Sequence, residues 1–187
     1  LLKILNYPLA APSANISSRV SPVTKNHVKE EFGKKIKYII EGGLSKIGLE
    51  STIINLIGKP EILRIGSIDI NKLSKALKKK LLYRKKTYMK VPGQNRLHYS
   101  PGIPLRMNCK EASLDEAFIL VKKRNNSNKN FFYLSKNKNL KEAARNLYSV
   151  LRMIKKKGYK KIAVEKIENK GIGLAINDRL QKASTKK

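Results

Sequence analysis

Residues 8–22, PLAAPSANISSRVSP, concentrate small polar side chains that could bind an anionic ligand, and we refer to them as the serine loop. Ser13 and Ser21 supply hydroxyl groups, and Asn15 adds an amide. Hydroxyls and backbone N–H groups near the start of a helix suit phosphate or carboxylate groups. An ordinary surface loop of turn-forming residues would have the same composition, and this segment taken alone slightly favours that alternative.

Two other segments have a similar chemical character. In GLEST, Ser51 and Thr52 stand at the beginning of an expected strand, beside a glycine. In LRIG, Arg64 lies in an apolar strand, where a guanidinium group is costly unless it meets an anion. Hydrogen bonding at a strand start and an exposed strand position explain these residues equally well. The three segments together are more specific than any one of them.

The elements that must position these residues alternate between helices and strands. Ser21-Pro22 predicts a helix that begins there and ends at Gly33. Further along, the patterns predict a strand over 37–40, a hairpin of 51–58 and 61–66, and a helix over 69–81.

The second half of the chain has a clearer pattern. Residues 82–105 have no regular period and predict a linker. The patterns after it predict strands over 117–123 and 130–135, a helix over 139–158, a strand over 160–167 and a helix over 175–184. In the long helix one apolar face is expected from Leu140, Ala144, Leu147, Leu151 and Ile154. This order predicts a small α/β layer domain.

The composition excludes several kinds of site. A single cysteine, Cys109, rules out an intrachain disulfide and a cysteine metal cluster, and two histidines are too few for a convincing zinc site. The sequence has no nucleophile-elbow, P-loop or dinucleotide-binding motif. No apolar run is long enough to cross a membrane, and no secretory signal is visible. We therefore expect a soluble, cytoplasmic protein.

The net charge of +29 and the isoelectric point near 10.3 suggest a polyanionic partner such as RNA. The charge is spread evenly along the chain rather than concentrated in one tail. An AT-rich coding bias, which enriches lysine, asparagine and isoleucine, explains the composition equally well.

Several motifs resemble the two-domain threonylcarbamoyl-AMP synthases. PLAAPSANISSRVSP, EGGLSKIGLESTIINL and ILRIGSI resemble the carboxyl-side half of the YrdC-like domain of that family. PGQNRLHYSPGIPL resembles its linker, and KKIAVEKIENKGIGLAINDRL resembles the end of its C-terminal domain. The resemblance implies an α/β fold with three parts, namely a partial YrdC-like domain (1–81), a linker that acts as an active-site lid (82–105) and a small Rossmann-like domain (106–187).

The resemblance also implies a reaction. Such enzymes use L-threonine, bicarbonate and ATP to form threonylcarbamoyl-AMP and pyrophosphate, with Mg²⁺ assisting. The product supplies the tRNA threonylcarbamoyl-transferase machinery that modifies an adenosine of tRNA. The protein holds the reactants in line and offsets phosphate charge, so the resemblance implies neither a catalytic nucleophile nor a protein-held metal.

Carried over residue by residue, the resemblance implies the roles of eight side chains. It assigns ATP contacts to Ser13, Ser21, Arg64 and Tyr99. It places Ala11 and Ser51 in the threonine site, and Asn15 and Thr52 as supports of the loop.

The sequence also departs from the family pattern. Ser18 stands where the family usually has glycine, so we expect a strained turn there. The family's amino-terminal portion, with its lysine-and-arginine phosphate motif, does not appear in these 187 residues, so we expect no synthase activity from this chain alone. Two alternatives remain: a basic module that binds double-stranded RNA or tRNA without catalysis, and a remnant that pairs with a separately made N-terminal half.

Overall fold

The structure is a computed structural model that describes residues 2–83, 91–93, 98–125 and 128–184. Parts of the predicted linker, residues 84–90 and 94–97, lie outside the described residues. Within the described ranges, no helix combines the length and apolar character that a membrane crossing needs.

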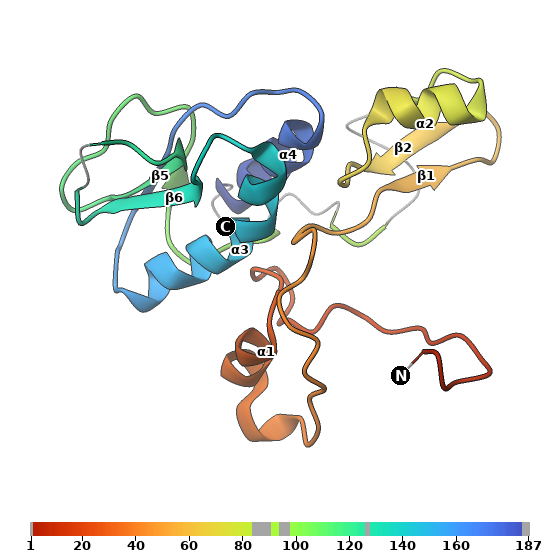
Figure 1. Cartoon of the computed structure of the whole chain (residues 1–187), viewed down its shortest axis with the longest axis horizontal. Helices are drawn as coiled ribbons and strands as arrows, with labels where there is room; N and C mark the ends of the chain where they lie inside the picture. Colours follow the sequence, from red (N-terminus) through yellow and green to blue (C-terminus); the bar gives the residue numbers. More distant parts are fainter. Residues whose placement is uncertain (1, 84–90, 94–97, 126–127, 185–187) are drawn as a thin grey trace.

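A small three-stranded sheet with one helix forms the part of the chain around residues 53–83 (Figure 1). Its elements are β1 (Ile53–Asn55), β2 (Glu61–Arg64), α2 (Ile70–Leu77) and β3 (Leu82–Tyr83). β1 and β2 are antiparallel, which confirms the predicted hairpin. β3 joins β2 in parallel, so the sheet continues into the range predicted as a linker.

The first 50 residues are mostly irregular. They contain the helix α1 (Lys25–Phe32) and the 3-10 turn η1 (Gly33–Lys35). The predicted end of this helix at Gly33 is confirmed, but its predicted start at Ser21 is wrong. Thr24 caps the helix by accepting the His27 N–H, while the Ser21 hydroxyl donates to Glu50 instead.

The predicted strand over 37–40 is also wrong. Tyr38 and Ile40 are 79% and 73% exposed, and the described residues include no strand beside them. A short apolar run forms a strand only where a neighbouring strand pairs with it, and here no pairing strand is described.

The second half of the chain forms a four-stranded parallel sheet in the order β4-β7-β5-β6. Its elements are β4 (Leu105–Arg106), β5 (Ala117–Lys122), β6 (Phe131–Ser135), α3 (Leu140–Lys156), β7 (Ile162–Val164) and α4 (Ile172–Ser184). The predicted strands and helices correspond to β5, β6, α3, β7 and α4, whereas β4 was not predicted. The chain has the expected α/β fold class.

The main hydrophobic core lies between this sheet and α3, with α4 packed beside α3 (Figure 1). Four of the five residues on the predicted apolar face of α3 are at most 1% exposed, namely Ala144, Leu147, Leu151 and Ile154. The fifth residue, Leu140, packs against the same core from its edge.

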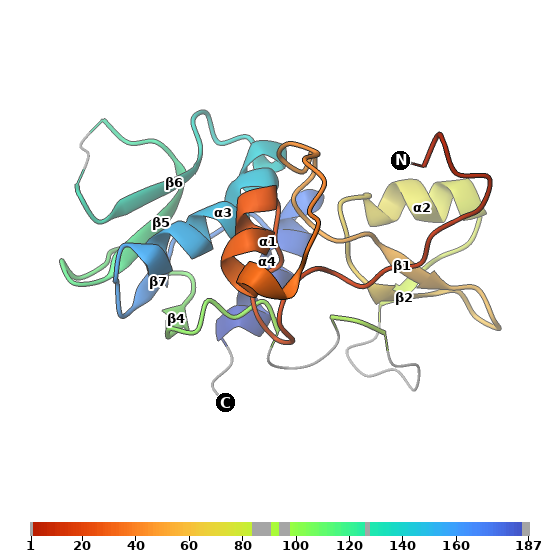
Figure 2. The same cartoon turned by 90° about the horizontal axis from the view of Figure 1, so that it is seen from below.

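The irregular first segment packs against the second half of the chain. Val20 and Val23 of the serine loop and its following turn belong to the main core, together with Tyr99. The Arg152 guanidinium of α3 donates to Glu31 of α1 at 3.1 Å; α1 lies below α3 in Figure 1 and therefore in front of it in the view from below (Figure 2). These contacts bring the predicted site residues next to α3 and α4.

Candidate functional site

The serine loop is held by its own polar groups and by the linker. The Asn15 side-chain amide donates to the backbone oxygens of Ile16 and Arg19. Ser18 has a φ of 67°, in the left-handed region that favours glycine, as expected for a position that is usually glycine. The Ser100 N–H of the linker donates to the Ser18 carbonyl at 2.9 Å. The loop and the linker are therefore docked on each other.

Glu50 is the centre of a half-buried polar cluster. It accepts hydrogen bonds from the Ser21 hydroxyl at 2.7 Å, from the Tyr148 hydroxyl at 2.9 Å and from the Arg179 Nε at 2.9 Å. Burial raises the pKa of Glu50, but the Arg179 guanidinium and the Ser21 hydroxyl outweigh this effect, so the pKa lies below its usual value. Glu50 is therefore an ionised acceptor that joins the serine loop to α3 and α4.

Arg64 at the end of β2 binds the residue next to Glu50. Its Nε donates to the Ser51 carbonyl at 2.9 Å, one terminal nitrogen donates to the Ser51 hydroxyl at 3.0 Å, and the other donates to the Pro92 carbonyl at 3.1 Å. Across the described ranges, Arg64 forms no ion pair with a carboxylate. Its positive charge can therefore interact with an anionic ligand.

Tyr99 of the linker is 1% exposed and has a φ of 58°. Its ring stacks on Tyr148 with centroids 5.8 Å apart, and the Arg179 guanidinium lies 4.9 Å from its centroid. Burial raises the pKa of Tyr99 to about 12. Since protein covers the ring, a contact between Tyr99 and a nucleotide requires the linker to move.

Because Gly93 has no side chain, the Tyr99 hydroxyl and the Arg64 side chain can both lie against its backbone. Gly93 has a φ of +88°, and a Cβ there would lie 2.3 Å from the Tyr99 hydroxyl and 3.3 Å from the Arg64 Cδ. A side chain at position 93 would therefore separate the linker from the end of β2.

A cavity of about 330 Å³ lies between the serine loop and α3. Ser13, Ser21, Glu50 and Tyr148 are among the residues that line it. Because Tyr148 comes from the second half of the chain, the two halves share the wall of this cavity. Hydroxyl groups in a largely apolar concave surface are typical of small-ligand sites.

The structure brings most of the predicted site residues together, although it does not test their roles. Ser13 and Ser21 line the cavity. Ser51 directly follows Glu50, which accepts from Ser21, and Arg64 donates to Ser51. Tyr99 and Arg64 both lie beside Gly93. The Thr52 hydroxyl is buried beside Gly66 and has no hydrogen-bond partner in the described part of the chain. Ala11 is exposed in the segment before these residues.

Glu50, Tyr148 and Arg179 were not predicted as site residues. Glu50 was inside the GLEST motif, but its partners are 98 and 129 positions away in the sequence. Arg179 did carry a local signal, because it lies between Ala175 and Ala183 at the spacing of the buried face of α4. A charged residue on an apolar stripe needs a buried partner.

The described residues contain no group of three or more histidine, cysteine, aspartate or glutamate residues that could hold a metal ion. The Glu50 carboxylate is also already bonded to Ser21, Tyr148 and Arg179. Mg²⁺ remains a prediction, as an ion carried by the phosphates of ATP.

Two family models match the chain. The model described as "Threonylcarbamoyl-AMP synthase, C-terminal domain" matches residues 62–185. The model described as "Telomere recombination" matches residues 1–66. The two matches meet at β2, which carries Arg64.

Several proteins named threonylcarbamoyl-AMP synthase are similar to this chain. The protein from Pyrococcus abyssi is 33% identical over 98% of this chain and 60% of the relative. The protein from Schizosaccharomyces pombe is 32% identical over 99% of this chain and 54% of the relative. The chain thus spans between 54% and 60% of the length of these two relatives.

The fold comparison agrees with the sequence comparison. The crystal structure of P. abyssi Sua5 complexed with L-threonine matches with a TM-score of 0.79 and 31% identity. The match covers 92% of this chain and 56% of that structure's chain. The chain belongs to the threonylcarbamoyl-AMP synthase family.

Proposed function

We propose that this chain provides part of the ATP and threonine site for the synthesis of threonylcarbamoyl-AMP. The observation that carries this proposal is the pairing of Arg64 with Ser51 beside the serine loop. In the proposed reaction the amine of L-threonine attacks the carbon of bicarbonate, and a carbamate forms with loss of water. A carbamate oxygen attacks the α-phosphorus of ATP, and pyrophosphate leaves. The names of the relatives and the threonine complex of the P. abyssi structure support this proposal.

Arg64 would offset negative charge on the phosphates. Its guanidinium is held by three acceptors, two of them on Ser51, and no carboxylate within the described ranges neutralises it. A fixed positive charge that is already oriented loses little entropy on binding and stabilises developing charge during the transfer. Threonine and ATP would thus be held on either side of the Ser51 and Arg64 pair.

The hydrogen-bond directions define what the two serines can offer. The Ser51 hydroxyl accepts from Arg64, so its own proton is free to donate to the threonine carboxylate. The Ser21 hydroxyl donates to Glu50, so only its lone pairs face a ligand. Ser21 would therefore accept from a ribose hydroxyl or the adenine amino group rather than donate to a phosphate.

Ligand binding to the purified chain tests this function. We expect titration calorimetry to detect both ATP and L-threonine, and we expect Arg64→Gln to weaken ATP binding by about tenfold, the loss of one charge-assisted contact. Arg124→Gln is the matched control, because Arg124 is an exposed arginine paired with Glu165 at 3.3 Å. If neither ligand binds, the proposal fails for this chain.

Pyrophosphate release is a separate measurement. The sequence analysis predicts that the 187-residue chain alone releases none, and this remains a prediction. Release that depends on both ATP and threonine would contradict it and would show that these residues are sufficient for the reaction.

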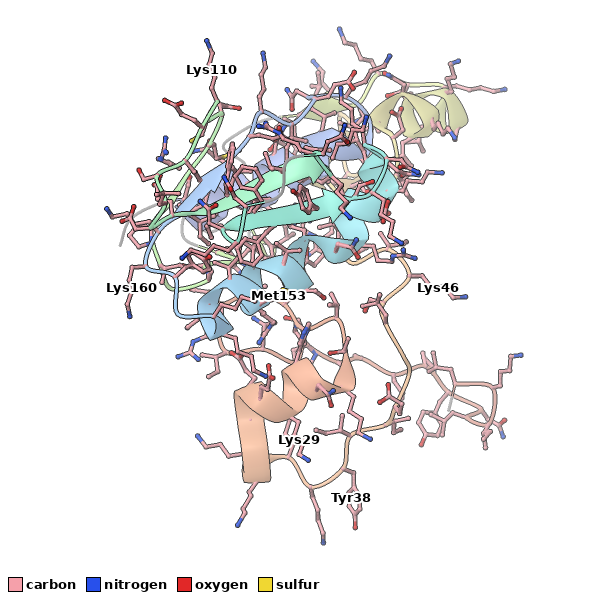
Figure 3. The ribbon with its side chains drawn as sticks, turned by 60° about the vertical axis from the view of Figure 1, so that its left-hand side comes forward. Lys29, Tyr38, Lys46, Lys110, Met153 and Lys160 are labelled. Carbon is pink, nitrogen blue, oxygen red and sulfur yellow. The ribbon has the colours of Figure 1, made fainter. Side chains whose placement is uncertain are left out.

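Binding of double-stranded RNA or tRNA is a second proposal, favoured by the net charge of +29. Figure 3 shows Lys29, Lys46, Lys110 and Lys160 projecting from different sides of the molecule. Charges spread in this way favour non-specific phosphate contacts over one defined RNA surface. A steep loss of RNA affinity with added salt would support this function, and affinity that is insensitive to salt would contradict it.

A further inference from the structure

We propose that Arg179 of α4 and Tyr148 of α3 are positioning residues for the site, which hold the Glu50-Ser51 segment and the Tyr99 linker in place. The proposal rests on the proposed function for the identity of the ligands. The second half of the chain would thus have a role in the site, although none of the predicted ligand contacts of the site comes from α3 or α4.

Three side chains from different elements converge on Glu50. Its carboxylate accepts from Ser21, Tyr148 and Arg179, which belong to the serine loop, α3 and α4. Glu50 is covalently joined to Ser51, which accepts two hydrogen bonds from Arg64. A displacement of Arg179 or Tyr148 would therefore move Ser51, the residue proposed to bind L-threonine.

Arg179 and Tyr148 also contact Tyr99. The Arg179 guanidinium lies 4.9 Å from the Tyr99 ring centroid, and the Tyr148 ring stacks on that of Tyr99. A cation–π contact is stronger away from water than at an exposed site. Arg179 and Tyr148 thus contact both Glu50 and the linker residue Tyr99.

The Arg179 side chain is 0% exposed, and its Nη2 has no hydrogen-bond partner among the described residues. A buried ion pair is often no more stabilising than well-packed apolar side chains, so stability alone does not explain a buried arginine here. A planar guanidinium that joins Glu50 to Tyr99 fixes their relative position, which an apolar side chain would not do.

Other charged groups surround this cluster without replacing Arg179. Asp178 pairs with Arg179 and with Lys182, whose Nζ lies 2.8 Å from the Asp178 carboxylate. His98 adjoins Tyr99, and its N–H donates to the Lys182 carbonyl. Lys182 is bonded to Asp178, so it does not supply the hydrogen bond to Glu50 that Arg179 makes.

Hydrogen exchange of the full chain without ligand tests the positioning directly. The Ser100 amide reports docking of the linker on Ser18, and the Ala117 amide, which donates to Lys161, reports the parallel sheet. We expect Arg179→Met to accelerate exchange at Ser100 by about tenfold and to leave Ala117 unchanged. Tyr148→Phe keeps the ring but loses the hydroxyl, and we expect a smaller acceleration at Ser100, about threefold.

Arg124→Met is the matched control for this experiment. Arg124 also pairs with a glutamate, Glu165, and lies 5.7 Å from the Phe118 ring centroid, but it is exposed. We expect no change at Ser100 in this variant. Unchanged exchange at Ser100 in both Arg179→Met and Tyr148→Phe would overturn the proposal, and so would equal acceleration at Ser100 and Ala117, which would indicate general destabilisation.

Ligand affinity provides the second readout. We expect Arg179→Met to raise the dissociation constant for L-threonine about tenfold and Arg179→Lys to restore part of the affinity. A threonine affinity that is unchanged in Arg179→Met would overturn the positioning role. If the unmodified chain binds no threonine, the proposed function fails, while the exchange at Ser100 still decides whether Arg179 positions the linker.

Discussion

The two halves of the chain bury their apolar side chains to very different extents. Residues 105–184 enclose the main core between a parallel sheet and two helices. Residues 2–83 contain all of the exposed large apolar side chains in the described part of the chain except Leu114 and Met153. Ile4 and Ile57, for example, are 82% and 79% exposed.

Several buried side chains of the first half pack against the second half. Val20 and Val23 are buried in the core of the second half, and Ala175 of α4 completes the small cluster around Ile62. The half-buried glutamates Glu31 and Glu50 pair with Arg152 and Arg179 of α3 and α4. The site residues of the first half are therefore positioned largely by a scaffold from the second.

The largest expected effect is the loss of core packing in the second half. Leu147 is 0% exposed in α3, so we expect Leu147→Ala to lower the free energy of unfolding by about 3 kcal/mol. Ile57→Ala, at an exposed position of the first half, should change it by less than about 0.5 kcal/mol. Urea unfolding followed by circular dichroism measures both. Equal effects of the two substitutions would show that the halves contribute equally.

A smaller effect is expected at the contact between the halves. Arg152 and Glu31 form an ion pair with side chains that are 14% and 5% exposed. We expect Arg152→Met to cost about 2 kcal/mol and to accelerate amide exchange in α1 more than in β5. Lys156→Gln removes an exposed pair with Glu30 and should have almost no effect. Exchange in α1 that does not change in Arg152→Met would mean that α1 is held by other contacts.

The pH dependence of stability should also originate mainly in the second half. The hydrogen bond from Arg106 lowers the pKa of Glu116 from 4.5 to about 2, although burial acts in the opposite direction. Since the folded-state pKa is the lower one, this stabilisation is present above pH 4.5 and is lost as the pH falls towards about 2. We expect Glu116→Gln to flatten the acid side of the stability profile. An unchanged profile would contradict this assignment.

The smallest expected effect is the loss of a helix N-cap, which can be compared between the two halves. Asp69 caps α2, and Asn139 caps α3, each through its side-chain oxygen. We expect Asn139→Ala to lower the free energy of global unfolding by about 1 kcal/mol. Asp69→Ala removes an equivalent cap but should mainly increase local exchange in α2. If Asp69→Ala lowers global stability as much as Asn139→Ala, the two halves unfold as one unit.

The elements of the second half were predictable because their patterns are local. The apolar face of α3 repeats at the helical period, and the strands around Phe118 and Ala163 are short apolar runs between turn residues. The wrong predictions occurred in the first half, where Lys37–Ile40 forms no strand and Thr24 rather than Ser21 caps α1. In both cases the outcome depended on a distant partner, or on the absence of one among the described residues.

The local sequence determined the helices, the hairpin and the family motifs. It also indicated that Ser13, Ser51 and Arg64 have a similar chemical character. Tertiary structure alone decided that Glu50 accepts from Ser21, Tyr148 and Arg179, and that the Tyr99 ring is buried against two of these. The physical reason is the range of the interactions. Backbone periodicity and capping act over a few residues, whereas a buried charge selects its partner from whatever the fold brings within about 3 Å.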